Sequence, residues 1–228
     1  YFYKWCKCNL VQGNIMSEFG YIPEAPEQSF GNNKGIFTPK DIYDLTRADK
    51  YTNYGQLDLL QTQTISSATA DFTALQETTY NVHFFTFTDV HIGSQTEFGY
   101  KVSNDGGTSF NTGTPFQFAN NRIVSDGANA SRQSTGQASG RLCGDIDAGA
   151  HSLANGYLYL YNAGDSTKHT MSTSHMVFED FQDLGAMEFG SQMYEGAPKF
   201  NNAIRFGAGT GTTALTSATI SCYGIRYA

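Results

Sequence analysis

Residues 199–228 read KFNNAIRFGAGTGTTALTSATISCYGIRYA, and this stretch decides the fold class. An apolar run at 203–206 leads into a loop of small residues at 207–213, and a second run occupies 218–227. Both runs alternate with a period of two and contain β-branched and aromatic residues, which predicts two strands. We therefore expect the chain to end inside a sheet, without a trailing tail.

Short runs of the same kind recur upstream of this stretch. The near-continuous apolar run at 80–90 predicts a strand that is covered on both faces. Residues 104–107, Asn-Asp-Gly-Gly, predict a hairpin turn. Residues 125–140 contain no large apolar side chain and predict a long loop. The remaining predicted strands lie at 56–66, 69–72, 98–103, 115–124, 141–146, 156–161, 170–178, 187–194 and 202–206.

The number and spacing of these runs predict an all-β fold. About ten or eleven short strands at regular spacing are typical of a sandwich or a barrel. No repeat of fixed period occurs, which argues against a propeller or a solenoid. We favour a jelly-roll-like β-sandwich over residues 56–228. Strand number alone does not separate a sandwich from a closed barrel, so a barrel stays open.

The N-terminal part differs in character from the strand-rich remainder. Residues 1–15 hold the only Trp and two of the four Cys, and Met16 follows as a natural start. We therefore expect residues 1–15 to be a leader or an upstream extension. Residues 16–55 predict an extended arm that is punctuated by Pro and Gly and carries one short helix.

The sequence Thr38-Pro39-Lys40-Asp41 predicts where this helix starts. A Thr suits the N-cap, a Pro suits the first helical position, and an acidic residue suits the third. Ile42 and Leu45 are three residues apart and would share one face. The helix is expected to end near Asp49.

Composition and charge argue against two classes of partner. Charged residues make up 15% of the chain, against about 25% in an ordinary soluble domain. The formal net charge is −7 and no run of basic residues occurs, which argues against nucleic acid as a partner. No continuous apolar stretch reaches about 18 residues, so we expect no membrane insertion.

The cysteines predict no metal site and no cofactor. Cys143 and Cys222 fall in predicted strands, where small buried free thiols are the favoured interpretation. A disulfide between these two cysteines stays open. Cys6 and Cys8 form a single pair, and no second pair completes the four ligands of a zinc site.

Two further groups of polar residues could hold a metal, but simpler interpretations are favoured. Asp89 and His91, with His83 nearby, would form half of a metal site; a solvent-facing strand end is the better interpretation. Asp145 and Asp147 resemble a calcium pair, which would need 6–8 oxygen ligands. A solvated turn is favoured for this pair because no further carboxylates follow at a recognisable spacing.

No catalytic residue is predicted. The sequence contains neither the nucleophile elbow of a hydrolase nor a phosphate-binding loop. A glycosidase would need two carboxylates that flank a cleft. The candidates for such a pair are Glu97, Glu179, Asp180, Glu188 and Glu195.

The best candidate for a binding face is a stripe of tyrosines. Alternation places Tyr157, Tyr159 and Tyr161 on one side of a strand, with Leu158 and Leu160 on the other. Tyrosines of this kind can bury at a subunit interface or stack on sugar rings. Interface formation or cross-strand packing is favoured over sugar binding.

Two polar loops are the candidates for surface contacts, because recognition residues are often found on loops. The predicted turn at 104–107 contributes Asn104 and Asp105. The predicted loop at 125–140 contributes Asn129, Arg132 and Gln133.

Two segments carry a resemblance to a known class of proteins. The C-terminal segment has the sequence N-x-I-R-F at 202–206, then a Gly/Thr/Ser loop, then T-I-S-x-Y-G-I-R at 219–226. The N-terminal segment has the sequence SFGNNKGIFTPKDIYDLT at 29–46. Over residues 16–228 the chain resembles virion structural proteins of tailed bacteriophages, especially exterior proteins of marine phages.

This resemblance implies a non-enzymatic protein of the virion, exposed as a tail appendage, tail fibre domain or capsid decoration subunit. It implies a homotrimer whose N-terminal arm docks onto other virion proteins, with a host surface glycan or protein as a further partner. Two alternatives stay open: a lectin-like carbohydrate-binding module and, less favoured, a polysaccharide-degrading enzyme.

Overall fold

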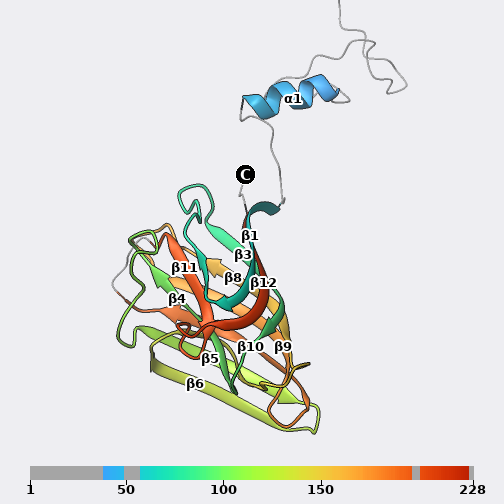
Figure 1. Ribbon diagram of the computed structural model, residues 1–228. Coiled ribbons are helices and arrows are strands. Elements are labelled where there is room, and N and C mark those ends of the chain that lie inside the picture. Colours follow the sequence, from blue (N-terminus) through green and yellow to red (C-terminus); the bar gives the residue numbers. More distant parts are fainter. Residues whose placement is uncertain (1–37, 49–56, 197–200, 226–228) are drawn as a thin grey trace, which may run out of the picture. The chain divides into compact units, whose positions relative to one another are not determined.

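The computed structural model describes residues 38–48, 57–196 and 201–225 (Figure 1). The chain divides into two units, residues 1–53 and 54–228. The described part of the first unit is a single helix, and that of the second unit is built from strands. The predicted leader and most of the predicted arm lie outside the described residues.

Helix α1, Pro39–Arg47, begins where the sequence predicts. The Asp41 backbone N–H donates to Thr38 Oγ1 at 3.2 Å, and the Thr38 backbone N–H donates to Asp41 Oδ2 at 2.9 Å. This reciprocal capping box satisfies two backbone donors that the first turn leaves free. The helix ends at Arg47, and the predicted end at Asp49 lies outside the described residues.

The second unit contains twelve described strands in two antiparallel sheets. The eight-stranded sheet has the order β1-β12-β3-β8-β9-β10-β5-β6, and the four-stranded sheet has the order β2-β11-β4-β7. The strands are β1 (Leu57–Ala68), β2 (Ala70–Phe72), β3 (Val82–His91), β4 (Thr96–Ser103), β5 (Phe116–Val124), β6 (Asn129–Gln137), β7 (Gly140–Ile146), β8 (Ala154–Tyr161), β9 (Thr170–Glu179), β10 (Gly185–Tyr194), β11 (Ala203–Ala208) and β12 (Leu215–Ile225).

The two sheets pack face to face, which confirms the predicted all-β sandwich. Each strand of the four-stranded sheet is preceded and followed along the chain by a strand of the eight-stranded sheet. The two strands predicted from residues 199–228 are therefore β11 and β12, one in each sheet. The predicted jelly-roll connectivity stays a prediction.

Strand β6 corrects the prediction of a long loop at 125–140. Residues Asn129–Gln137 form a strand that pairs with β5 along one edge of the eight-stranded sheet. An edge strand with little buried surface needs no apolar side chains, because its backbone hydrogen bonds to β5 hold it in place. Polar edge strands also discourage pairing with other chains.

Residues 104–107 form the predicted turn, but the prediction that this turn closes a hairpin is wrong. The flanking strands β4 and β5 belong to different sheets, so residues 104–115 cross between them. The carboxylate of Asp105 holds the turn by accepting from Ser103 Oγ at 2.6 Å and from the Ser109 backbone N–H at 2.9 Å. These hydrogen bonds lower the pKa of Asp105 to about 2.

The core between the sheets is built around Phe206 of β11, which is fully buried. Its ring lies 5.0–6.2 Å, centroid to centroid, from five other aromatic rings. Three of these contacts are edge-to-face and two are tilted, and aromatic pairs prefer such arrangements to face-to-face stacking. The five partners are Phe72, Phe85, Phe87, Phe98 and Tyr100.

Cys143 and Cys222 are both buried and both free, as the favoured interpretation predicted. Burial raises the pKa of each thiol, to about 12 for Cys222, which keeps the thiols protonated at neutral pH. No disulfide joins them. The other two cysteines lie outside the described residues.

Candidate functional site

The face of the eight-stranded sheet that points away from the four-stranded sheet, here called the outer face, carries the predicted tyrosine stripe. Leu158 and Leu160 of β8 are fully buried, whereas Tyr157 is 40% exposed. Tyr159 lies between its two neighbours, with ring centroids 5.9 Å from Tyr157 and 6.4 Å from Tyr161. The predicted alternation along this strand is therefore correct.

Cross-strand pairing places Tyr157, the first residue of this stripe, in a row of five residues that crosses five strands. Tyr157 lies opposite His175 of β9, and His175 lies opposite Phe189 of β10. Phe189 in turn lies opposite Asn121 of β5, which lies opposite Ser131 of β6. The ring centroids are 5.8 Å apart for Tyr157 and His175 and 6.2 Å apart for His175 and Phe189. We call these five residues the Phe189 row.

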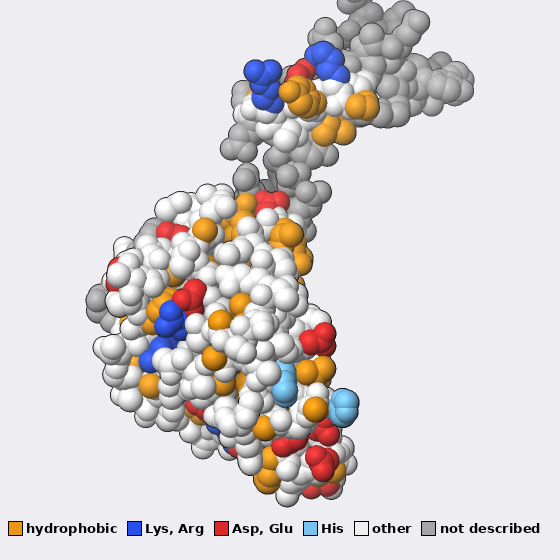
Figure 2. Space-filling model, in the orientation of Figure 1, with side chains coloured by type: hydrophobic (Ala, Val, Ile, Leu, Met, Phe, Trp, Pro, Cys, Tyr) orange, Lys and Arg blue, Asp and Glu red, His pale blue; other side chains and the backbone are white. Residues whose placement is uncertain are grey.

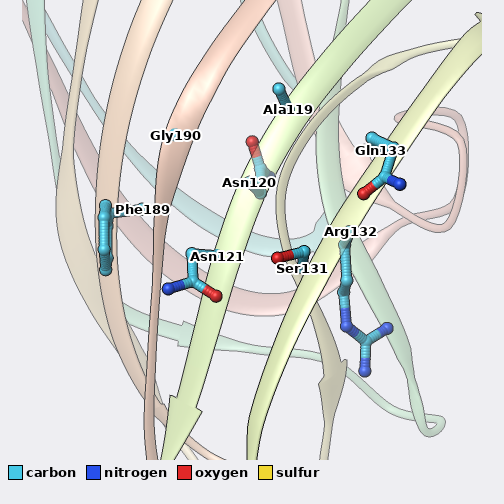
Figure 3. A pocket seen from close by; sticks show the side chains of 8 residues that line it. All are labelled: Ala119, Asn120, Asn121, Ser131, Arg132, Gln133, Phe189 and Gly190. Carbon is cyan, nitrogen blue, oxygen red and sulfur yellow. The ribbon is translucent and has the colours of Figure 1, made fainter.

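A hollow of about 520 Å³ opens beside Phe189, over β5, β6 and β10 (Figure 3). Figure 3 shows the Phe189 ring edge-on, so that one face of the ring is turned toward Asn121. We call this hollow the Phe189 groove. Its lining residues are Ala119, Asn120, Asn121, Ser131, Arg132, Gln133, Phe189 and Gly190.

Two further hollows adjoin the Phe189 groove. One, of about 420 Å³, shares Phe189 and Gly190 with it and reaches Tyr157. The other, of about 600 Å³, shares Ala119 and Gln133 with it. Because the hollows share lining residues, we treat them together as one shallow depression of the outer face.

Three buried polar atoms along this depression have no hydrogen-bond partner among the described residues. They are Asn121 Oδ1, His175 Nε2 and Arg132 Nε. Buried polar atoms are normally paired, and an unpaired one often indicates a missing ligand or water. Asn121 and His175 are the two cross-strand neighbours of Phe189, so unpaired atoms lie on either side of that ring.

The other half of the outer face, over β1, β12, β3 and β8, is aromatic. Phe84 lies at its centre, with ring centroids 4.7 Å from Tyr159 and 6.0 Å from Tyr223. Leu59 of β1 lies opposite Tyr223 and is 59% exposed. We call Leu59, Phe84, Tyr159, Tyr161 and Tyr223 the aromatic surface.

A layer of hydrogen-bonded polar side chains lies beneath the Phe189 groove, between the sheets. Glu188 is fully buried; its Oε1 accepts from Asn120 Nδ2 at 2.9 Å and Arg141 Nε at 3.2 Å, and its Oε2 accepts from the Gly144 backbone N–H at 3.1 Å. Arg141 also donates to Glu97 Oε2 at 2.9 Å. Burial raises the pKa of Glu97, against the attraction of Arg141.

Gln192 extends this layer toward β9. Its amide nitrogen donates to the Arg141 carbonyl oxygen at 2.8 Å and to Ser174 Oγ at 3.1 Å. Its amide oxygen accepts from Ser172 Oγ at 2.5 Å, and Ser172 is 2.9 Å from the Tyr100 hydroxyl. These hydrogen bonds join β10 to β7 and β9 beneath the groove, and within the layer Arg141 Nη2 has no partner among the described residues.

The charged residues at the end of the layer form ion pairs. Arg122 donates to Asp145 Oδ2 and to Asp180 Oδ2, both at 2.6 Å. Arg132 of β6 donates to Asp145 Oδ2 at 2.5 Å, so the edge strand is tied to β7. The favoured interpretation of Asp145 as part of a solvated turn is therefore wrong, and Asp145 is a bridge between two arginines.

Three further candidates for metal ligands, His83, His91 and Asp147, are engaged elsewhere. His83 is fully buried, with Nε2 2.6 Å from the Leu75 carbonyl oxygen, and burial lowers its pKa. His91 Nε2 lies 3.1 Å from the Gly149 carbonyl oxygen. Asp147 accepts from the Gly149 backbone N–H at 2.8 Å, as its predicted turn requires. Within the described ranges, no group of three or more His, Cys, Asp or Glu could hold a metal ion.

The candidate surface-contact residues divide between two places. Arg132 and Gln133 line the Phe189 groove, from a strand and not from a loop. Asn129 is exposed at the start of β6, and Asn104 is exposed in the turn after β4. Asp105 is committed to its own turn by the hydrogen bonds described above.

Sequence reasoning missed four members of the Phe189 row: Phe189, His175, Asn121 and Ser131. The first three lie on predicted strands and Ser131 lies in the predicted loop, and only the pairing register brings the four together. The available signal was the alternation within β10, where Glu188 points inward and Phe189 therefore points outward.

Comparisons with protein-family models, with curated proteins and with solved structures gave no match for this chain. No helix in the described part of the chain is long and apolar enough to span a membrane.

Proposed function

We propose that this chain is a non-enzymatic structural subunit of a tailed-phage virion, exposed on the particle as a tail appendage, fibre or decoration protein. The resemblance of residues 16–228 to exterior phage proteins supports the virion setting. The aromatic surface supports a role in assembly, and it is the observation that carries the proposal.

The aromatic surface has the composition of a protein interface. Tyr and Phe are enriched at interfaces. The four rings of the aromatic surface are half-buried and adjacent to one another, and Leu59 beside them is exposed. Figure 2 shows hydrophobic side chains on the face of the second unit that it draws, some of them singly and some in small groups. In this proposal the aromatic surface packs against a second copy of the chain, and closed symmetry gives a homotrimer.

Light scattering on the purified protein tests the assembly. A mass of three chains is expected for the wild type, and Leu59→Lys should shift the mass toward one chain. Phe181→Lys is the matched control, because Phe181 is 45% exposed in the β9–β10 turn, away from the aromatic surface. A wild-type monomer, or equal effects of the two substitutions, would refute the assembly role.

A second experiment tests the virion setting separately. Antibodies against the second unit should label purified phage particles from the source of the sequence. If neither antibody labelling nor mass spectrometry detects the protein on the particles, it is not a virion subunit, whatever the mass of the free protein.

A further inference from the structure

We infer that the Phe189 groove is a binding site for a neutral saccharide. The saccharide would be the ligand of the outer face. This site rests on the proposed function in one respect, because both require the outer face to be a contact surface. The site lies on β10, β5 and β6, with Tyr157 of the tyrosine stripe in the adjoining hollow, and away from the 104–107 turn.

The Phe189 ring is exposed on the side that faces the groove. Phe189 is 40% exposed and presents one ring face to the groove (Figure 3). The face of an aromatic ring carries partial negative charge and attracts C–H groups. A pyranose ring has one such C–H-rich face, so it can pack flat against Phe189.

Polar atoms lie on both sides of the Phe189 ring. Figure 3 shows the side-chain oxygen of Asn121 and the hydroxyl of Ser131 directed toward each other between β5 and β6. Asn121 Oδ1 has no partner among the described residues, and neither does His175 Nε2 on the other side of Phe189. A hydroxyl group can both donate and accept. A ligand rich in hydroxyls therefore supplies a partner for each of these atoms, after small side-chain rotations.

Charge decides the class of saccharide. The cation in the groove lining is Arg132, and its guanidinium is already paired with Asp145 Oδ2. Asp145 compensates the charge of Arg132, although Arg132 Nε has no partner among the described residues, so the lining offers no net positive charge to a uronate, sulfate or sialic acid carboxylate. The chain as a whole carries a net charge of −7. The groove therefore favours a neutral hexose polymer over an acidic one.

The size of the depression favours a short stretch of polymer. The groove of about 520 Å³ shares lining residues with a hollow of about 420 Å³ toward β9 and β8, and with one of about 600 Å³ further along β5, β6 and β10. Tyr157 provides a second exposed ring in the same row, on the far side of His175. Several sugar units can thus lie across the strands. Many copies on a particle would strengthen weak single contacts by avidity.

The test is a titration of the full chain with neutral tetrasaccharides of glucose, galactose and mannose, and with an oligogalacturonate as the acidic probe. Calorimetry should detect binding of at least one neutral probe. Phe189→Ala should weaken that binding about tenfold or more, and Asn121→Ala by about three- to tenfold. Phe189→Trp should retain binding, and Phe181→Ala is the matched control for loss of an exposed ring.

Three results would overturn the inference: no binding of any neutral probe at millimolar concentration, binding that Phe189→Ala leaves unchanged, or binding of the acidic probe alone. Urea unfolding of each variant separates loss of binding from loss of fold. Light scattering on the same variants separates this inference from the assembly role, because Phe189 lies outside the aromatic surface and its substitution should leave the mass unchanged.

Discussion

Replacement of Glu188 by Gln tests whether the polar layer between the sheets stabilises the fold through charge. The substitution keeps the size and shape of the side chain but removes a fully buried carboxylate. One oxygen becomes an NH₂ group. In the least harmful orientation this group faces the Gly144 backbone N–H, which then loses its acceptor.

The magnitude follows from the contacts that are lost. A hydrogen bond to a charged group contributes about 1.5–3 kcal/mol, and removal of one partner of a buried ion pair costs about 3–5 kcal/mol. Arg141 keeps its second partner, Glu97 Oε2 at 2.9 Å, so the lower part of that range applies. We expect Glu188→Gln to lower the free energy of unfolding by about 3 kcal/mol.

Urea unfolding followed by fluorescence measures this change. With a slope of about 2–3 kcal/mol per molar urea, the midpoint should fall by about 1–1.5 M. Glu195→Gln is the matched control, because Glu195 is exposed just after the same strand, and its midpoint should change little. If the two variants unfold at the same urea concentration, the buried carboxylate does not contribute as argued.

Two further predictions concern the core and the turn after β4. Phe206→Ala should lower the free energy of unfolding by about 3–5 kcal/mol, measured by urea unfolding, because it removes a fully buried ring; a loss below 1 kcal/mol would contradict the central place of this ring. Asp105 has its pKa lowered from 3.8 to about 2, so its stabilising contribution is present above pH 3.8 and is lost as the pH falls to about 2. The difference in melting temperature between wild type and Asp105→Asn should therefore be largest above pH 4 and should disappear near pH 2, and a difference that is constant with pH would count against this explanation.

Much of the fold could be predicted because the deciding signals are local. The cap at Thr38 and Asp41 is a contact between residues three positions apart, so the sequence shows both partners. The strands with an apolar side chain at every second position, such as β8 and β12, were predicted for the same reason. Strand β6 was missed because its stability comes from pairing with β5 and from the ion pair of Arg132, neither of which leaves an apolar pattern.

The candidate site could be predicted only in part because it depends on register between distant strands. Phe189 and Asn121 are 68 positions apart and meet only because β10 pairs with β5 in one particular alignment. Likewise, the Asn-Asp-Gly-Gly turn has the composition of a hairpin, and no local signal shows that the strand after it joins the other sheet.

The position of β12 between β1 and β3 has a consequence for how this chain is synthesised. Strand β1 has β12 as its neighbour in the described sheet, and Leu57 lies opposite Ile225. A ribosome must therefore translate nearly all of the described sequence before β1 can pair and before β3 gains its second neighbour. Until then, the aromatic strand β3 has one unpaired edge. Pairings this distant also slow folding. Until residues 215–225 emerge, this edge is exposed to pairing with other chains.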